Sequence, residues 1–242
     1  MNKDLIFQSI VKKSATLPFV KVDRVVFLRK ELTPYYGEEV IKNVISHGTG
    51  EYVDKKIIDK IALGCINYHT TLVCGTSALA GIPGGWAMAG TIPADLAQFY
   101  GHVIALTQKL IYLYGWPDIT DEEGEIDDDT CSILILFIGL MMGEKLAVDG
   151  INTLLKSLGG QVEKRLARMA LSEVGLYNLI QQVCKWIGVK VTKESFSKAA
   201  GKAIPLIGAP VSATLTYVTF KPMARRLKRK LDEQWALAHP KR

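Results

Sequence analysis

The sequence predicts an all-α protein: a compact helical bundle with glycine- and proline-broken apolar helical hairpins and a basic C-terminal amphipathic helix. Three observations predict this fold class. Apolar residues recur every three or four positions along most of the chain, which is the period of a helix with one buried face. Hydrophobic residues make up 48% of the 242 residues, enough for a substantial core. Glycine and proline gather between the periodic segments, where they interrupt helices. We therefore expect a single helical domain over residues 1–242.

The first part of the chain predicts several helices and one long uncharged segment. We expect short helices over residues 3–13, 21–32 and 38–47, and a long helix from near Tyr52 to Ala80. Between Ile61 and Ala94, 34 consecutive residues contain no Lys, Arg, Asp or Glu. Such a segment is long enough for a membrane hairpin, but polar residues and glycines dilute it. We favour a buried hairpin in a soluble bundle, with shallow or conditional insertion and true spanning as alternatives.

Residues 81–117 connect this helix to the best-patterned helix of the chain. The turn residues, and the residues that start and stop the second helix, are Pro83, Gly84, Gly85, Pro93, Asp95 and Gly115. Pro93 suits the first helical turn, and the carboxylate of Asp95 lies near the positive end of the helix dipole. An apolar stripe then runs from Leu96 to Leu113, and Gly115 ends the helix.

The polar side of this helix holds the one candidate polar site. Asp95 and His102 are seven residues apart, so they lie near one face of the helix. The simpler interpretation is that they belong to its solvated side, together with Gln98 and Lys109.

Residues 118–129 form an acidic loop with eight carboxylates and no basic residue. We expect a solvated loop rather than a cation site, because the pattern of a calcium-binding loop is absent. Thr130–Gly143 follows as the most hydrophobic run, and its length favours a central core helix over a membrane span. An amphipathic helix is then expected over Val162–Trp186, and a second glycine-proline turn precedes the uncharged residues 203–220.

The C-terminal residues 221–242 carry eight basic and two acidic side chains, so they account for the whole net charge of +6. Met223, Leu227, Leu231 and Trp235 recur every four residues and form the apolar face of a helix. The residues expected to contact a membrane are Arg225, Arg226, Lys228, Arg229, Lys230 and Trp235. A basic group near an anionic leaflet contributes about 1 kcal/mol. The alternative is a terminal helix that docks on the protein by its apolar face. Nucleic acid is not expected as a partner, because aromatic residues do not alternate with the basic ones.

The sequence contains no motif that predicts catalysis. It lacks the G-x-S-x-G nucleophile turn, the phosphate-binding G-x-x-x-x-G-K-[ST] loop and the zinc-binding H-E-x-x-H pattern. The four cysteines are widely spaced, and we expect them to be reduced and buried. We therefore predict no catalytic residues, no metal site and no cofactor. No signal peptide opens the chain, so we expect a cytoplasmic protein.

Three blocks of the sequence resemble the EcsC protein family. The central block reads AGIPGGWAMAGTIPADLAQFYGHVIALTQKLIYLYGWPD, and the flanking blocks read TLPFVKVDRVVFLRKEL and KAIPLIGAPVSATLTYVTF. The resemblance covers about Leu17 to Lys230. The positions that match the family pattern are Pro83, Gly84, Gly85, Pro93, Asp95, Tyr100 and Gly115. It implies a helical bacterial protein, often membrane-associated, without agreed catalytic residues, and its gene-neighbourhood name suggests a protein partner encoded nearby.

These observations lead to three hypotheses about function. The first is a non-enzymatic bacterial protein that associates peripherally or conditionally with anionic lipids at the inner face of the cell membrane. In a stronger form it is a membrane-perturbing effector in bacterial conflict or phage defence. The second is a soluble carrier of a lipid or another apolar ligand, and the third is a hydrolase that uses Asp95 and His102. The oligomeric state is not predicted.

Overall fold

A computed structural model describes residues 3–80, 94–121, 123–158, 176–201 and 208–240 of the chain. Every regular element in these ranges is an α-helix, which confirms the predicted all-α fold class. The helices are α1 (Lys3–Ala15), α2 (Arg24–Leu32), α3 (Glu38–His47), α4 (Lys55–Ala80), α5 (Ala94–Leu113), α6 (Asp128–Met142), α7 (Lys145–Leu158), α9 (Leu176–Gly201) and α10 (Gly208–Ala238).

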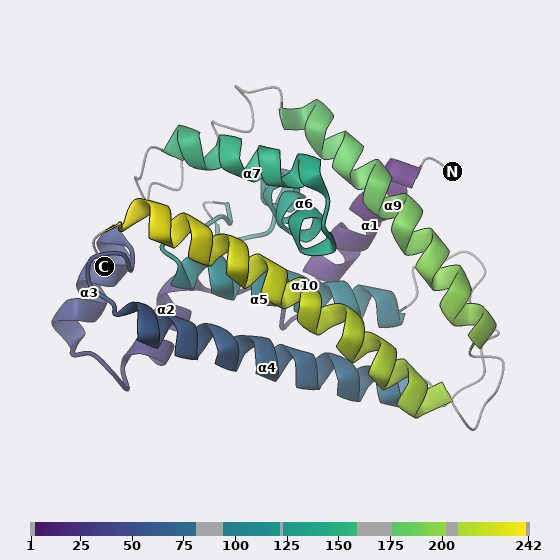
Figure 1. Cartoon of the computed structure of the whole chain (residues 1–242), viewed down its shortest axis with the longest axis horizontal. Helices are drawn as coiled ribbons and strands as arrows, with labels where there is room; N and C mark the ends of the chain where they lie inside the picture. The colour runs from purple at the N-terminus through teal and green to yellow at the C-terminus, as the bar shows by residue number, and fades with distance from the viewer. Residues whose placement is uncertain (1–2, 81–93, 122, 159–175, 202–207, 241–242) are drawn as a thin grey trace.

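The bundle is built around α6 and around the pair formed by α4 and α10. Figure 1 shows α4 and α10 running past each other in opposite directions on the side that faces the viewer, with α5 behind them. α6 contacts α1, α5, α7, α9 and α10. Nearly all of its residues are buried, from Thr130 to Met142, which confirms the prediction of a central core helix.

The short helices near the N-terminus match their predicted places. α3 has the predicted bounds of 38–47. α2 begins at Arg24 rather than at residue 21, because the Asp23 carboxylate caps the helix by accepting a 2.9 Å hydrogen bond from the Val26 backbone N–H. Val25 and Val26, in the first turn of α2, are exposed.

The end of α5 shows why Gly115 stops the helix. Gly115 has a φ of +89°, in the left-handed region that a residue with a side chain rarely adopts. The Trp116 backbone N–H donates to the Ile111 carbonyl at 3.0 Å, which closes the turn. The Thr49 hydroxyl donates to the Leu113 carbonyl at 2.9 Å. The turn predicted at Pro83, Gly84, Gly85 and Pro93 lies outside the described residues.

Two carboxylates of the acidic loop accept hydrogen bonds from residues of the loop and of the neighbouring helices. Asp118 accepts hydrogen bonds from the Tyr112 hydroxyl at 3.0 Å and from the Thr120 backbone N–H at 3.0 Å. Asp127 caps α6 by accepting from the Thr130 backbone N–H at 2.9 Å. Glu123, Glu125, Asp128 and Asp129 are exposed, as the prediction of a solvated loop expects, whereas Asp118 and Asp127 are half-buried and hold the two ends of the loop. In the part of the chain that the structure describes, no group of His, Cys, Asp and Glu could hold a metal ion.

Helix α10 corrects the prediction of a separate C-terminal helix. The uncharged and basic segments form one helix that passes through Pro222 without interruption. Pro222 is exposed, so the carbonyl that loses its helical hydrogen-bond donor is near solvent, which lowers the cost of a proline inside the helix. α9 likewise extends beyond Trp186 to Gly201, and Tyr177 near its start is 68% exposed.

None of the described helices combines the length and the apolar character that crossing a bilayer requires.

Candidate functional site

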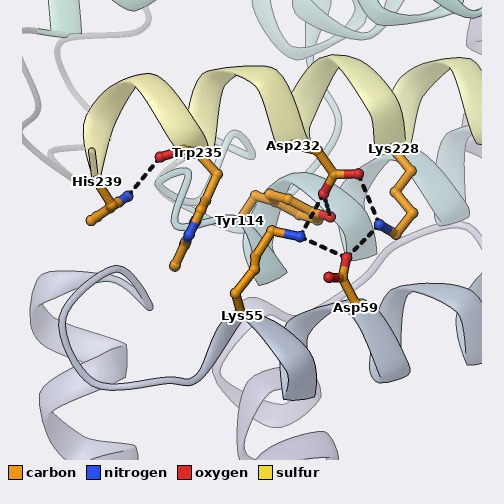
Figure 2. Close-up of polar contacts among 7 residues, drawn as sticks. All are labelled: Lys55, Asp59, Tyr114, Lys228, Asp232, Trp235 and His239. Carbon is orange, nitrogen blue, oxygen red and sulfur yellow. Dashed lines mark hydrogen bonds and ion pairs between the residues drawn. The ribbon is translucent and has the colours of Figure 1, made fainter. Parts of the chain in front are cut away.

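A cluster of charged side chains fastens α10 to α4 (Figure 2). The Lys55 ammonium lies 2.6 Å from an Asp59 carboxylate oxygen and 2.7 Å from an Asp232 carboxylate oxygen. Lys228 pairs with Asp232 at 2.8 Å and also with Asp59. The Tyr114 hydroxyl, just after α5, donates to Asp232. Two lysines and two aspartates meet here, so the cluster is electrically neutral.

The pKa values in the cluster show that its charged forms are stabilised. Burial alone would raise the pKa of Asp232, but hydrogen bonds from Lys228, Lys55 and Tyr114 hold it below its usual value. Burial alone would lower the pKa of Lys228, but its hydrogen bonds to Asp232 and Asp59 raise it. Burial and the hydrogen bond to Asp232 raise the pKa of Tyr114. The charged forms of Asp232 and Lys228 are therefore the stable ones at neutral pH.

Four of the six residues expected to contact a membrane are used within the fold. Trp235 is 7% exposed and packs edge-on against Tyr114, with ring centroids 6.2 Å apart. Lys228 belongs to the charged cluster. Arg226 donates to the Met141 carbonyl at the end of α6, and Lys230 lies 3.5 Å from a carboxylate oxygen of Glu233. Arg226, Lys228 and Trp235 thus have partners on other elements, and Lys230 has one on its own helix, while membrane contact by these four side chains stays a prediction.

The other two, Arg225 and Arg229, are exposed on the outer side of α10. Neither forms a hydrogen bond or an ion pair with another residue that the structure describes. On the helix surface, where each residue is turned by about 100° from the one before it, Arg225 and Arg229 lie outside the buried stripe. Their side chains therefore point away from the core. Among the tail cations that the structure describes, these two are the exposed ones.

Two further cations, Lys56 and Lys60, are exposed on α4, and no sequence pattern described above singles them out. Lys55 and Asp59 face α10, and Lys56 and Lys60, each one residue later, are exposed on the adjacent side of α4. The Lys60 ammonium lies 5.1 Å from the centre of the Tyr35 ring, which belongs to the connection between α2 and α3. α4 and α10 run in opposite directions (Figure 1). In an antiparallel pair, the residues that follow the contact positions by about 100° lie on the same side of both helices. We name Lys56, Lys60, Arg225 and Arg229 the basic patch. No local pattern could reveal it, since only the pairing of Lys55 with Asp232, 177 positions apart, brings its two halves together.

The candidate polar site on α5 is buried instead of solvated. His102 is 5% exposed, and its ring stacks on Phe19 with centroids 4.5 Å apart. Its Nδ1 lies 3.3 Å from Nδ1 of His69 on α4, and Nε2 of His69 lies 3.0 Å from the Lys109 ammonium. Since an ammonium only donates, Lys109 donates to His69 Nε2, and His69 Nδ1–H then donates to His102 Nδ1. The side chain of Asp95 lies outside the described residues.

This histidine pair is held neutral. Burial, together with the positive charge of Lys109 and the neighbouring His102, lowers the pKa of His69 to about 3. Burial and Lys109 lower the pKa of His102 to about 4. Burial also lowers the pKa of Lys109. The prediction that His102 lies on the solvated side of the helix is wrong, because α4 and the segment before α2 cover that side.

The four cysteines are free thiols, as predicted. Cys65, Cys131 and Cys184 are buried, and Cys74 is half-buried. Burial raises the pKa of Cys65 and of Cys131 to about 11, so both are unreactive thiols at neutral pH.

A scan against models of protein families, a search of curated proteins and a search of solved structures each find no match to this chain. The EcsC resemblance therefore stays a prediction that rests on the sequence blocks quoted above.

Proposed function

We propose that this protein is a non-enzymatic peripheral membrane protein whose basic patch binds the anionic inner surface of the cytoplasmic membrane. The observation that carries the proposal is the exposure of Lys56 and Lys60 on α4 and of Arg225 and Arg229 on α10, two helices that pack against each other. The resemblance to the EcsC family, whose members are often membrane-associated, supports the same function.

The acids of the two helices do not neutralise the patch. α4 and α10 carry only three acidic residues, Asp59, Asp232 and Glu233. Each of them pairs with a lysine outside the patch: Lys55, Lys228 or Lys230. The patch therefore presents four positive charges to an approaching surface.

The expected strength of binding follows from the number of cations. At about 1 kcal/mol for each cation near an anionic leaflet, the patch contributes about 4 kcal/mol at low ionic strength. Salt screens charges beyond about 8 Å at physiological ionic strength. Binding through the patch alone should be weak, reversible and sensitive to salt, which agrees with peripheral or conditional association.

The first prediction concerns the four cations of the patch. The variant Lys56→Gln, Lys60→Gln, Arg225→Gln, Arg229→Gln should bind anionic vesicles at least about tenfold more weakly at low salt, since tenfold corresponds to about 1.4 kcal/mol. Co-sedimentation with vesicles of phosphatidylcholine and phosphatidylglycerol measures this. All four residues are exposed, so folding should be unaffected.

The matched control removes the same charge elsewhere. Lys30, Lys42, Lys145 and Lys185 are exposed on α2, α3, α7 and α9, and their replacement by Gln should leave most of the binding intact. Equal losses in both variants would show that net charge alone drives binding. A wild-type protein that does not bind anionic vesicles at low salt would refute the proposal.

A further inference from the structure

The exposed face of α4 and α10 changes character along its length. Beyond the basic patch, α4 has no charged residue from Ile61 to Ala80, and α10 has none before Lys221. The exposed side chains here include Leu63, Tyr217 and Val218, which are 46%, 46% and 56% exposed. Leu63 is three residues after Lys60 and adjoins the patch, whereas Tyr217 and Val218 lie eight and seven positions before Arg225. We name Leu63, Tyr217, Val218 and the exposed Pro222 the apolar strip.

Lys221 is the one cation within the strip, and its side chain extends back along α10 toward Tyr217. Its ammonium bonds to the Tyr217 hydroxyl at 2.7 Å and lies 4.8 Å from the centre of the Tyr217 ring. The lysine stem and the tyrosine ring present an apolar body with a polar tip, an arrangement suited to a membrane–water interface. The charge of Lys221 therefore does not prevent the strip from contacting apolar groups.

The basic patch and the apolar strip are neighbours. Val218 and Arg225 are seven positions apart, which is about 10 Å along a helix. A lipid leaflet changes from anionic headgroups to acyl chains over a similar depth of about 5–10 Å. A free polyanion offers charge to the patch but nothing apolar to the strip, so the pairing of the two favours a lipid surface.

We infer that the α4/α10 face docks on an anionic bilayer in one orientation, with the patch at the lipid phosphates and the strip at the headgroup–acyl boundary. This inference rests on the proposed membrane binding and specifies how the protein lies on the membrane. The helix pair is then inclined to the bilayer, and the N-terminal half of α10 lies deeper than its C-terminal half.

The test places a fluorescent reporter on the strip and another on a remote face. Val218→Cys and Val26→Cys, each in a Cys74→Ser background, are labelled with an environment-sensitive fluorophore. Val26 is 62% exposed on α2 and serves as the matched control. The other native cysteines are buried and should not be labelled. With anionic vesicles that contain acyl-chain nitroxide lipids, the label at 218 should shift to the blue and be quenched, and the label at 26 should not change.

Two unlabelled variants test the same point by affinity. Val218→Asp should weaken vesicle binding about fivefold, because the carboxylate would enter the headgroup–acyl boundary. Val26→Asp adds the same charge on another face and should retain more of the binding. Binding of inorganic polyphosphate should be affected equally by the two substitutions, since this probe uses only the charge of the patch.

The outcomes separate this inference from the proposed function. Vesicle binding without quenching at position 218, or with equal quenching at 218 and 26, would overturn the orientation and leave peripheral binding in place. Equal effects of Val218→Asp and Val26→Asp on vesicle binding would also overturn it. If the wild-type protein binds no vesicles, both proposals fail.

Discussion

His69 and His102 lie against each other where α4 contacts α5. Burial and the charge of Lys109 oppose protonation of both rings. In the unfolded chain each has an ordinary pKa near 6.5, whereas the folded protein lowers these values to about 3 and about 4. Below pH 6.5 the unfolded chain therefore binds more protons than the folded one, and the stability falls as the pH falls. The stability that the two neutral histidines contribute is complete above pH 6.5, and it is lost as the pH falls toward their pKa values in the folded protein.

The prediction at the residue scale is that His102→Gln reduces the acid sensitivity of the protein. Each buried neutral histidine should cost about 1 kcal/mol of stability per pH unit below 6.5. Between pH 7 and pH 5 the variant should lose about 1–2 kcal/mol less than the wild type, as measured by urea unfolding. Asp232 should contribute little to this difference, because its lowered pKa lies below this window.

Thr107→Ala is the control, because it alters a buried and non-titrating neighbour on α5. It should lower the stability by the same amount at both pH values. An unchanged pH dependence in His102→Gln would show that the histidine pair is not responsible for acid sensitivity.

At the scale of the element, α10 is a core helix whose cations have different roles. The spacing of Met223, Leu227, Leu231 and Trp235 predicted its apolar face, and all four are buried. This part was predictable because helical periodicity is local. The roles of Lys228 and Arg226 were not, since their partners Asp59 and Met141 are far away in the sequence.

The prediction for this element is that Asp232→Asn destabilises the protein by about 1–2 kcal/mol, between the values for exposed and buried ion pairs. The substitution leaves Lys55 and Lys228 to share one carboxylate. A double-mutant cycle with Lys228→Met, measured by urea unfolding, should show coupling of about 1 kcal/mol. Glu233→Gln removes a more exposed pair and should cost little. Additive effects of Asp232→Asn and Lys228→Met would contradict the cluster.

For the whole molecule, the sequence predicted the fold class and most helix positions, but it predicted the wrong environment for polar side chains such as that of His102. His102 was expected in water because an amphipathic pattern gives only the direction of the core from one helix. α4 and Phe19 cover the opposite side of α5, and neither is visible in that local pattern. The basic patch was missed for the same reason, since α4 and α10 lie side by side only through tertiary packing.

The prediction for the whole molecule is that a chain ending at Phe220 does not unfold cooperatively. The deletion removes the buried Leu227, Leu231 and Trp235, each worth about 1.5–3 kcal/mol, from a total stability of about 5–15 kcal/mol. Circular dichroism during urea titration would show a broad transition. A chain ending at Pro240 should unfold like the full protein. Cooperative unfolding of the shorter chain would mean that the basic segment is an appendage.

The antiparallel contact between α4 and α10 also affects the order of folding during synthesis. Lys55 and Asp232 are separated by 177 positions, so α4 is made long before its main partner. Until α10 leaves the ribosome, the apolar side of α4 that includes Ile58, Ala62 and Ile66 has no complete cover. Contacts between distant segments form late, and nascent chains expose apolar surface in the meantime. The closing of this helix pair should therefore be one of the last folding events.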